Sequence, residues 1–284
     1  MTEFLEAIAS HAFMRNALYA GAMASVACGV VGSLVVVRRI AYMAGGIAHC
    51  VLGGIGAAVY FERVHGWTWL EPLYGALVAA LLAALIIGYA RLRGRERTDT
   101  VIGAVWAIGM SLGVLFLAGT PGYGADLMGY LFGNILMVSS RELWLLGALD
   151  IVVLAVAFLL HDQLAAVCFD PEFARTRGLR VDALFMTLLV LTALTTVLLV
   201  LVVGIVMMLA LLTIPAAIAG RFADRLSRMM LGGAVLTALF TFVGLAVSYT
   251  PELPAGATIV AVTGVTYLIV IAATRSPHAT GTAP

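Results

Sequence analysis

Apolar runs long enough to cross a lipid bilayer follow one another along almost the whole of this chain. A transmembrane helix needs about 20 mostly apolar residues. Runs of this kind predict nine spans, at about 15–37, 40–61, 72–90, 100–118, 142–161, 183–203, 204–219, 229–247 and 257–274. Only 11% of the residues are charged, against roughly 25% in soluble domains. The chain is therefore predicted to be an all-α, polytopic membrane bundle that forms one domain over residues 1–284.

The longest apolar run covers residues 183–219 and is too long for a single crossing. As one straight helix it would measure about 55 Å, well beyond the roughly 30 Å of hydrocarbon in a bilayer. We predict a break at Gly204 and a kink or break at Pro215, because proline disrupts a helix interior. The alternative count is eight spans, with 204–219 only partly inserted.

The basic residues are unevenly distributed between the two ends of the predicted bundle. All 16 are arginine, and thirteen of them follow odd-numbered spans: Arg38, Arg39, Arg91, Arg93, Arg95, Arg97, Arg175, Arg177, Arg180, Arg221, Arg225, Arg228 and Arg275. Basic loops stay in the cytoplasm, so the N-terminus is predicted outside and the C-terminus inside. The net charge of +1 gives no broad basic surface for nucleic acid.

Two segments between the spans are predicted to be short helices. The apolar piece 127–138 is too short to span and is predicted to be interfacial or re-entrant. The inner loop 162–182 has room for one short helix, at about 170–178. The tail 275–284 is expected to be disordered.

The helix at 170–178 has clear start and stop signals. Asp170 suits the N-cap, Pro171 the first helical position, and Gly178 the residue after the last turn. Its acidic residue Glu172 comes first and its arginines come last, as the helix dipole favours. Such a helix on the cytoplasmic face is either a loose amphipathic cap or a docking lever for a partner.

Two ionisable residues fall within the predicted spans, His49 in the second and Asp150 in the fifth. Charged or titratable groups are costly in lipid and are therefore candidates for a functional role. Imidazole is a common ligand of transition metals, and a carboxylate could join it in a polar path. The alternative is that both side chains serve helix packing. Gly45 and Gly53 flank His49 by one turn and leave room for an ion or for a neighbouring helix.

One apparent catalytic motif is rejected. Residues 109–113 match G-x-S-x-G, but that motif requires a strand-to-helix turn and this stretch lies within a span. No Walker A sequence, dinucleotide fingerprint or H-E-x-x-H motif occurs.

Five motifs in order resemble the membrane permeases of ABC-type importers for zinc, manganese and iron. They are RRIAY at 38–42 with IAH at 47–49, LFGNIL at 131–136, FDPEFA at 169–174 with GL at 178–179, LLTIPAA at 211–217 and LPAGA at 253–257. The similarity extends along nearly the whole chain. It departs from the family pattern at Gly45, where the family often has aspartate.

The resemblance implies a subunit of an ATP-driven importer in the cell (inner) membrane that moves a divalent metal ion by alternating access. It implies a homodimer around a central path, with His49, Asp150 and Glu252 as candidate path residues. An external metal-binding protein would deliver the ion to short outer loops. A separate ATPase subunit would bind the helix that contains Asp170, Pro171, Glu172, Ala174 and Gly178. ATP would bind on that partner, so the chain would not itself be an enzyme and would hold no stable cofactor.

A second hypothesis is a self-contained secondary transporter that uses His49 or Asp150 as a proton relay. Uptake by the chain alone, driven by a proton gradient, would distinguish it from the ABC importer.

Overall fold

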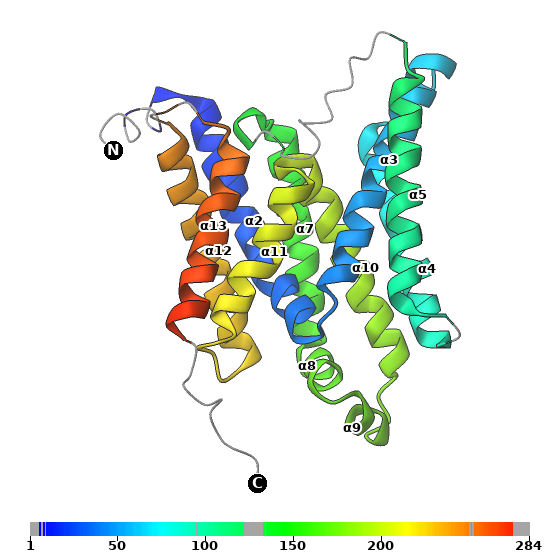
Figure 1. Cartoon of the computed structure of the whole chain (residues 1–284), viewed down its shortest axis with the longest axis vertical. Coiled ribbons are helices and arrows are strands. Elements are labelled where there is room, and N and C mark those ends of the chain that lie inside the picture. The colour runs from blue at the N-terminus through cyan, green and yellow to red at the C-terminus, as the bar shows by residue number, and fades with distance from the viewer. Residues whose placement is uncertain are drawn as a thin grey trace.

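The computed structural model describes residues 6, 8, 10–94, 96–121, 133, 135–249, 251 and 253–274, and every regular element within these residues is helical (Figure 1). The long helices are α2 (Ala12–Val37), α3 (Ala41–His65), α4 (Pro72–Arg93), α5 (Thr98–Ala118), α7 (Ser140–Leu159), α10 (Val181–Val203), α12 (Leu226–Tyr249) and α13 (Ala255–Ala273). The shorter ones are η1 (Ile135–Met137), α8 (His161–Phe169), α9 (Pro171–Thr176) and α11 (Ile205–Ala219).

Eight helices in the described part of the chain are long and apolar enough to cross a membrane, and α11 is a shorter apolar helix of 15 residues. At 1.5 Å per residue, α11 is about 22 Å long. It runs between the two ends of the bundle beside α2, α12 and α13 (Figure 1). Within the described residues there are therefore eight full-length candidate spans and one shorter apolar helix, which agrees with the alternative count of eight; partial insertion of 204–219 stays a prediction.

The predicted break at Gly204 is confirmed. α10 ends at Val203, α11 starts at Ile205, and Gly204 has φ +80° and ψ 166°, a conformation that is essentially restricted to glycine. Gly133 packs so closely on the backbone of Val203 and Gly204 that a Cβ atom there would collide with it. The helix is not broken a second time at Pro215, because α11 continues through this proline to Ala219.

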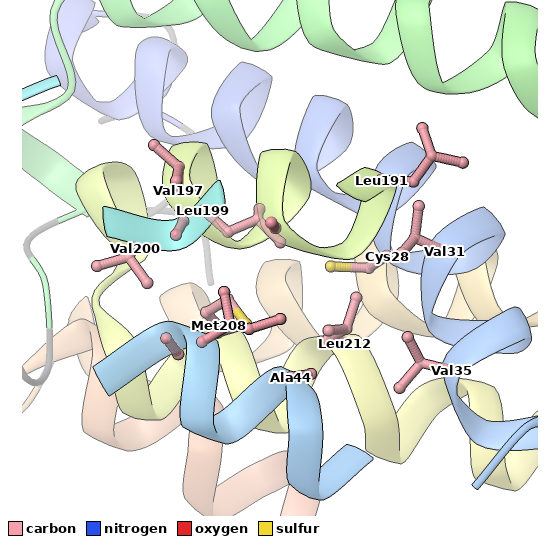
Figure 2. Packing of buried hydrophobic residues seen from close by; sticks show 14 of the residues in the cluster. Cys28, Val31, Val35, Ala44, Leu191, Val197, Leu199, Val200, Met208 and Leu212 are labelled. Carbon is pink, nitrogen blue, oxygen red and sulfur yellow. The ribbon is translucent and has the colours of Figure 1, made fainter. Parts of the chain in front are cut away.

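The centre of the bundle is formed by α2, α3, α10 and α11. Figure 2 shows how side chains from these four helices interdigitate, with Cys28, Leu191, Met208 and Leu212 pointing into one cluster. α12 packs on α2 through small residues: a Cβ on Gly29 would lie 2.6 Å from the Ala234 Cβ. Small residues let membrane helices approach closely, since van der Waals packing replaces the hydrophobic effect in lipid.

One end of the bundle holds the described arginine clusters. The C-terminal ends of α2 and α4 and the N-terminal ends of α10 and α12 lie together with α8 and α9, at the bottom of Figure 1. This agrees with the predicted sorting of arginines to one side. That this end faces the cytoplasm remains a prediction from the positive-inside rule.

The inner loop differs from the prediction of one short helix. α7 ends at Leu159, two residues before the predicted end of its span, and the chain then forms both α8 and α9. α8 is amphipathic and buries Leu164, Val167 and Cys168 against the bundle. Its N-cap residue, Leu160, makes no side-chain hydrogen bond, so the sequence carries no cap signal for this helix. Most of the predicted helix 127–138 and all of the tail 275–284 lie outside the described residues.

Candidate functional site

His49 lies in the N-terminal half of α3 and is 8% exposed. Its ring stacks on the indole of Trp106 in α5, with the ring centroids 4.2 Å apart and the planes 10° from parallel. Its Nδ1 is buried and has no hydrogen-bond partner among the described residues. The imidazole is therefore held by an aromatic contact, and that ring nitrogen remains free to bind a ligand.

The two glycines that flank His49 have different surroundings. A Cβ on Gly53 would lie 2.6 Å from the carbonyl oxygen of Gly109 in α5, so Gly53 is required for close packing of α3 on α5. A Cβ on Gly45 would meet its nearest neighbour, Leu209 Cδ2, at an ordinary 3.7 Å. The space beside His49 is thus closed on the Gly53 side and roomier on the Gly45 side.

An open groove of about 760 Å³ lies along α5 beside this histidine. Trp106 and Ser111 contribute polar groups to its wall, as does Tyr42 from the start of α3, whose ring centroid is 6.2 Å from that of Trp106. His49 is not part of the wall, so the indole of Trp106 separates the imidazole from the groove. Ser111 has no hydrogen bond to a histidine in the described structure, which gives no support to a serine hydrolase.

Asp150 occupies a different environment. It lies in α7, is 7% exposed, and is adjacent to Ala27 and Cys28 of α2. Its Oδ1 has no hydrogen-bond partner in the described part of the chain. α7 packs on α2 and α10, whereas His49 faces α5, so the two predicted path residues are not brought into one site.

No group of three or more His, Cys, Asp or Glu side chains that could hold a metal ion occurs among the described residues. Glu252, the third predicted path residue, lies outside them. Of the predicted path residues that the structure describes, His49 lies behind the indole that lines this groove, whereas Asp150 does not line it.

The predicted helix of the inner loop is present as α9. The Asp170 carboxylate accepts a hydrogen bond of 2.9 Å from the N–H of Phe173, and Pro171 occupies the first helical position. Glu172 is exposed in the first turn, while Ala174 is fully buried and anchors the helix to the bundle.

Gly178 ends α9 as predicted. It has φ +78°, and its N–H donates to the Arg175 carbonyl while the N–H of Leu179 donates to the Ala174 carbonyl. This pair of bonds is the Schellman motif, which favours glycine at this position. Phe173 is 52% exposed with the Arg177 guanidinium above its ring, so α9 presents an aromatic group at its surface.

Cys168, on α8, is a buried thiol at the same end of the bundle. Burial raises the pKa of the Cys168 thiol to about 11, although the nearby Arg38 guanidinium acts in the opposite direction. The thiolate is the form that binds metals, so this cysteine is a poor ligand at neutral pH.

Trp106 was not predicted from the sequence as a site residue. Its distinguishing signal is its position near the middle of a span, whereas tryptophan is usually enriched at the membrane interfaces. What the sequence does not show is that α5 packs on α3 in the register that stacks residue 106 on residue 49.

Comparisons with known proteins agree along the whole chain. The family model described as the ABC 3 transport family matches residues 10–274. An uncharacterized membrane protein of Synechocystis sp. is 42% identical over 97% of this chain and 95% of its own length. The manganese import system permease protein ScaB of Streptococcus parasanguinis is 32% identical over 95% of this chain and 93% of its own. Among solved structures, PsaBC from Streptococcus pneumoniae in complex with Fab matches with a TM-score of 0.83 and 29% identity, covering 97% of this chain and 96% of that one.

Proposed function

The chain belongs to the ABC 3 transport family, and from this premise we propose that it is the membrane-spanning permease of an ATP-driven importer of divalent metal ions, with manganese as the first candidate. The observation that carries the proposal is the family match over nearly the full length, together with a relative named as a manganese import permease. ATP hydrolysis belongs to a separate subunit, as in other ABC permeases. The family match favours this function over a proton-coupled secondary transporter.

We place the metal path along the face of α3 that contains His49. Neutral imidazole is a good ligand for divalent transition metals, and the unpartnered Nδ1 and the space beside Gly45 support this role. Trp106 covers the imidazole on the groove side, so an ion reaches His49 from the groove only after the indole moves. Asp150 and Glu252 remain candidates for other steps of the path.

A second copy of the chain is proposed to complete the path. The groove at Trp106 is open and lies on α5, a span with few buried residues in the single chain. An ion in lipid requires walls on all sides, because unsolvated charge in hydrocarbon is strongly unfavourable. A symmetric copy packed against this face of α5 would supply the missing wall.

We propose that α9 is the docking helix for the ATPase subunit. The helix is held by its cap at Asp170 and by buried Ala174, and it exposes Phe173. A rigid short helix with an exposed aromatic anchor is well suited to transmit movement of a partner. An extracytoplasmic metal-binding protein is proposed to deliver the ion at the opposite end.

The transport test uses the permease reconstituted in proteoliposomes with its ATPase and binding protein. We expect manganese uptake that requires ATP and all three proteins. Uptake by the permease alone that follows an imposed proton gradient would contradict the proposal and support the secondary transporter.

The docking test compares two exposed phenylalanines at the same end of the bundle. Phe173→Ala is expected to reduce co-purification of the ATPase, while Phe222→Ala, a change at a 71% exposed ring in another loop, leaves it intact. Equal recovery of the ATPase with both variants would contradict docking on α9.

A further inference from the structure

A cavity of about 280 Å³ lies where α9 meets the ends of α2, α4 and α10. Its charged lining consists of Arg38 after α2, Arg91 near the end of α4, Glu172 and Arg175 on α9, and Asp182 at the start of α10. Three guanidinium groups and two carboxylates give the cavity a net charge of +1. A small, positively charged cavity at the end of a membrane bundle suggests a site for a single anion.

The charges in this cavity are not all compensated. Arg175 donates to the Asp182 carboxylate at 2.5 Å, which pairs one cation with one anion. Arg38 and Arg91 then remain with Glu172 as the other charged lining groups. The Nε of Arg38 is buried and has no hydrogen-bond partner among the described residues. A buried donor without a partner is unfavourable, so an acceptor in the cavity would stabilise it.

The two arginines that remain beside Glu172 both lie near one aromatic ring. The guanidinium carbons of Arg38 and Arg91 lie 5.8 and 5.9 Å from the centroid of Phe185 in α10. Guanidinium groups stack on aromatic rings and also bind phosphate oxygens in pairs. Both arginines also line the same small cavity, so an anion bound there would have two guanidinium groups in its wall.

The cavity lies at the arginine-rich end of the spans, and the ends of transmembrane helices are the level at which a bilayer has its headgroups. Apolar side chains share its wall with the charged ones, among them Phe185. A wall that combines guanidinium groups with apolar surface fits a headgroup phosphate joined to a glycerol backbone. Phe173, the exposed aromatic residue of α9, is not part of the wall, so occupancy leaves it free for a protein partner.

We propose that this cavity binds the phosphodiester of an anionic phospholipid from the leaflet at the arginine-rich end. The lipid would contact Arg38 and Arg91 and so join the ends of α2 and α4 beside α9. Lipid binding here can fail separately from the proposed metal path, because neither His49 nor the groove at Trp106 is involved, although Pro171 and Glu172 of the proposed docking helix share the cavity wall.

The test measures lipid binding to the full-length permease by native mass spectrometry, with phosphatidylglycerol and phosphatidylcholine as probes. We expect preferential retention of phosphatidylglycerol. Arg38→Gln and Arg91→Gln should each weaken this binding about tenfold, the scale of one charge-assisted hydrogen bond. Arg225→Gln, an exposed arginine outside the cavity at the same end, is the matched control and should bind as the unmodified protein does.

A further variant and a competition experiment with inorganic phosphate complete the test. If a glutamine variant does not fold, Arg91→Lys is measured instead. This change keeps the positive charge but removes the planar guanidinium group, which can donate two parallel hydrogen bonds to a phosphate. We expect it to bind less tightly than the unmodified protein. Equal retention of both lipids, equal weakening by Arg225→Gln, or displacement of the lipid by millimolar inorganic phosphate would overturn the proposal.

Discussion

His49 and Asp150 are both ionisable residues buried within spans, yet their surroundings differ. His49 lies between two packed helices, with its ring on Trp106 and an open groove behind that indole. Asp150 lies against the backbone of α2 near Cys28 and does not line that groove. The comparison shows that scarcity of polar residues in a membrane identifies candidates, whereas the neighbouring helices decide which candidate an ion can reach.

The largest structural effect is expected from the glycines that flank His49. Gly53→Ala should lower the stability of the permease by about 1–3 kcal/mol, because its methyl group would be forced against the Gly109 carbonyl. Gly45→Ala is the matched control and should change stability by less than about 1 kcal/mol, since its methyl group fits. Thermal unfolding of the purified variants in detergent measures both. If the two variants lose equal stability, the space beside Gly45 is not as open as the structure indicates.

The next effect concerns the indole that separates His49 from the groove. Trp106→Leu should raise the rate at which diethylpyrocarbonate modifies His49 by about three- to tenfold, given the roughly 0.5–1.5 kcal/mol of an aromatic pair. Peptide mass spectrometry locates the modified histidine, and Trp106→Phe serves as the control that retains a ring. An unchanged rate in the leucine variant would show that Trp106 does not cover the imidazole.

The smallest effect uses the native cysteines as reporters of the two regions. Cys50 follows His49 and is 9% exposed at an apolar groove between α3, α4 and α5, whereas Cys28 beside Asp150 is 1% exposed. A lipid-soluble maleimide should therefore modify Cys50 before Cys28. The labelling of Cys168 should become faster as the pH approaches about 11, because burial raises the pKa of its thiol to about that value and the thiolate is the reactive form. Faster labelling of Cys28 than of Cys50 would contradict the expectation that the region of His49 is the more accessible of the two.

The helical architecture was predictable because each span is long and apolar. The break at Gly204 was predictable for the same reason, since 183–219 exceeds a bilayer's thickness. α8 was missed because the inner loop was assigned a single short helix, and α8 has no side-chain cap to signal a second one. α9 was predicted because Asp170 and Gly178 are local signals that depend on no distant contact.

The candidate site was only partly predictable. His49 and Asp150 could be found from their chemistry and position within spans. The stack of His49 on Trp106 could not, because it depends on the packing of α3 against α5 through Gly53 and Gly109. Likewise, the sequence does not show that Asp150 and His49 lie in different parts of the bundle, because tertiary packing decides which helices are neighbours.

The most direct test of the central claim is manganese uptake at limiting metal concentration by the complete transporter in proteoliposomes, with His49→Ala and Asp150→Asn compared side by side. We expect His49→Ala to lower uptake at least about tenfold, since even partners of a metal ligand contribute that much to affinity. Asp150→Asn should have a clearly smaller effect, with both variants assembled normally. Uptake by His49→Ala equal to that of the unmodified transporter would contradict a role for His49 in the metal path.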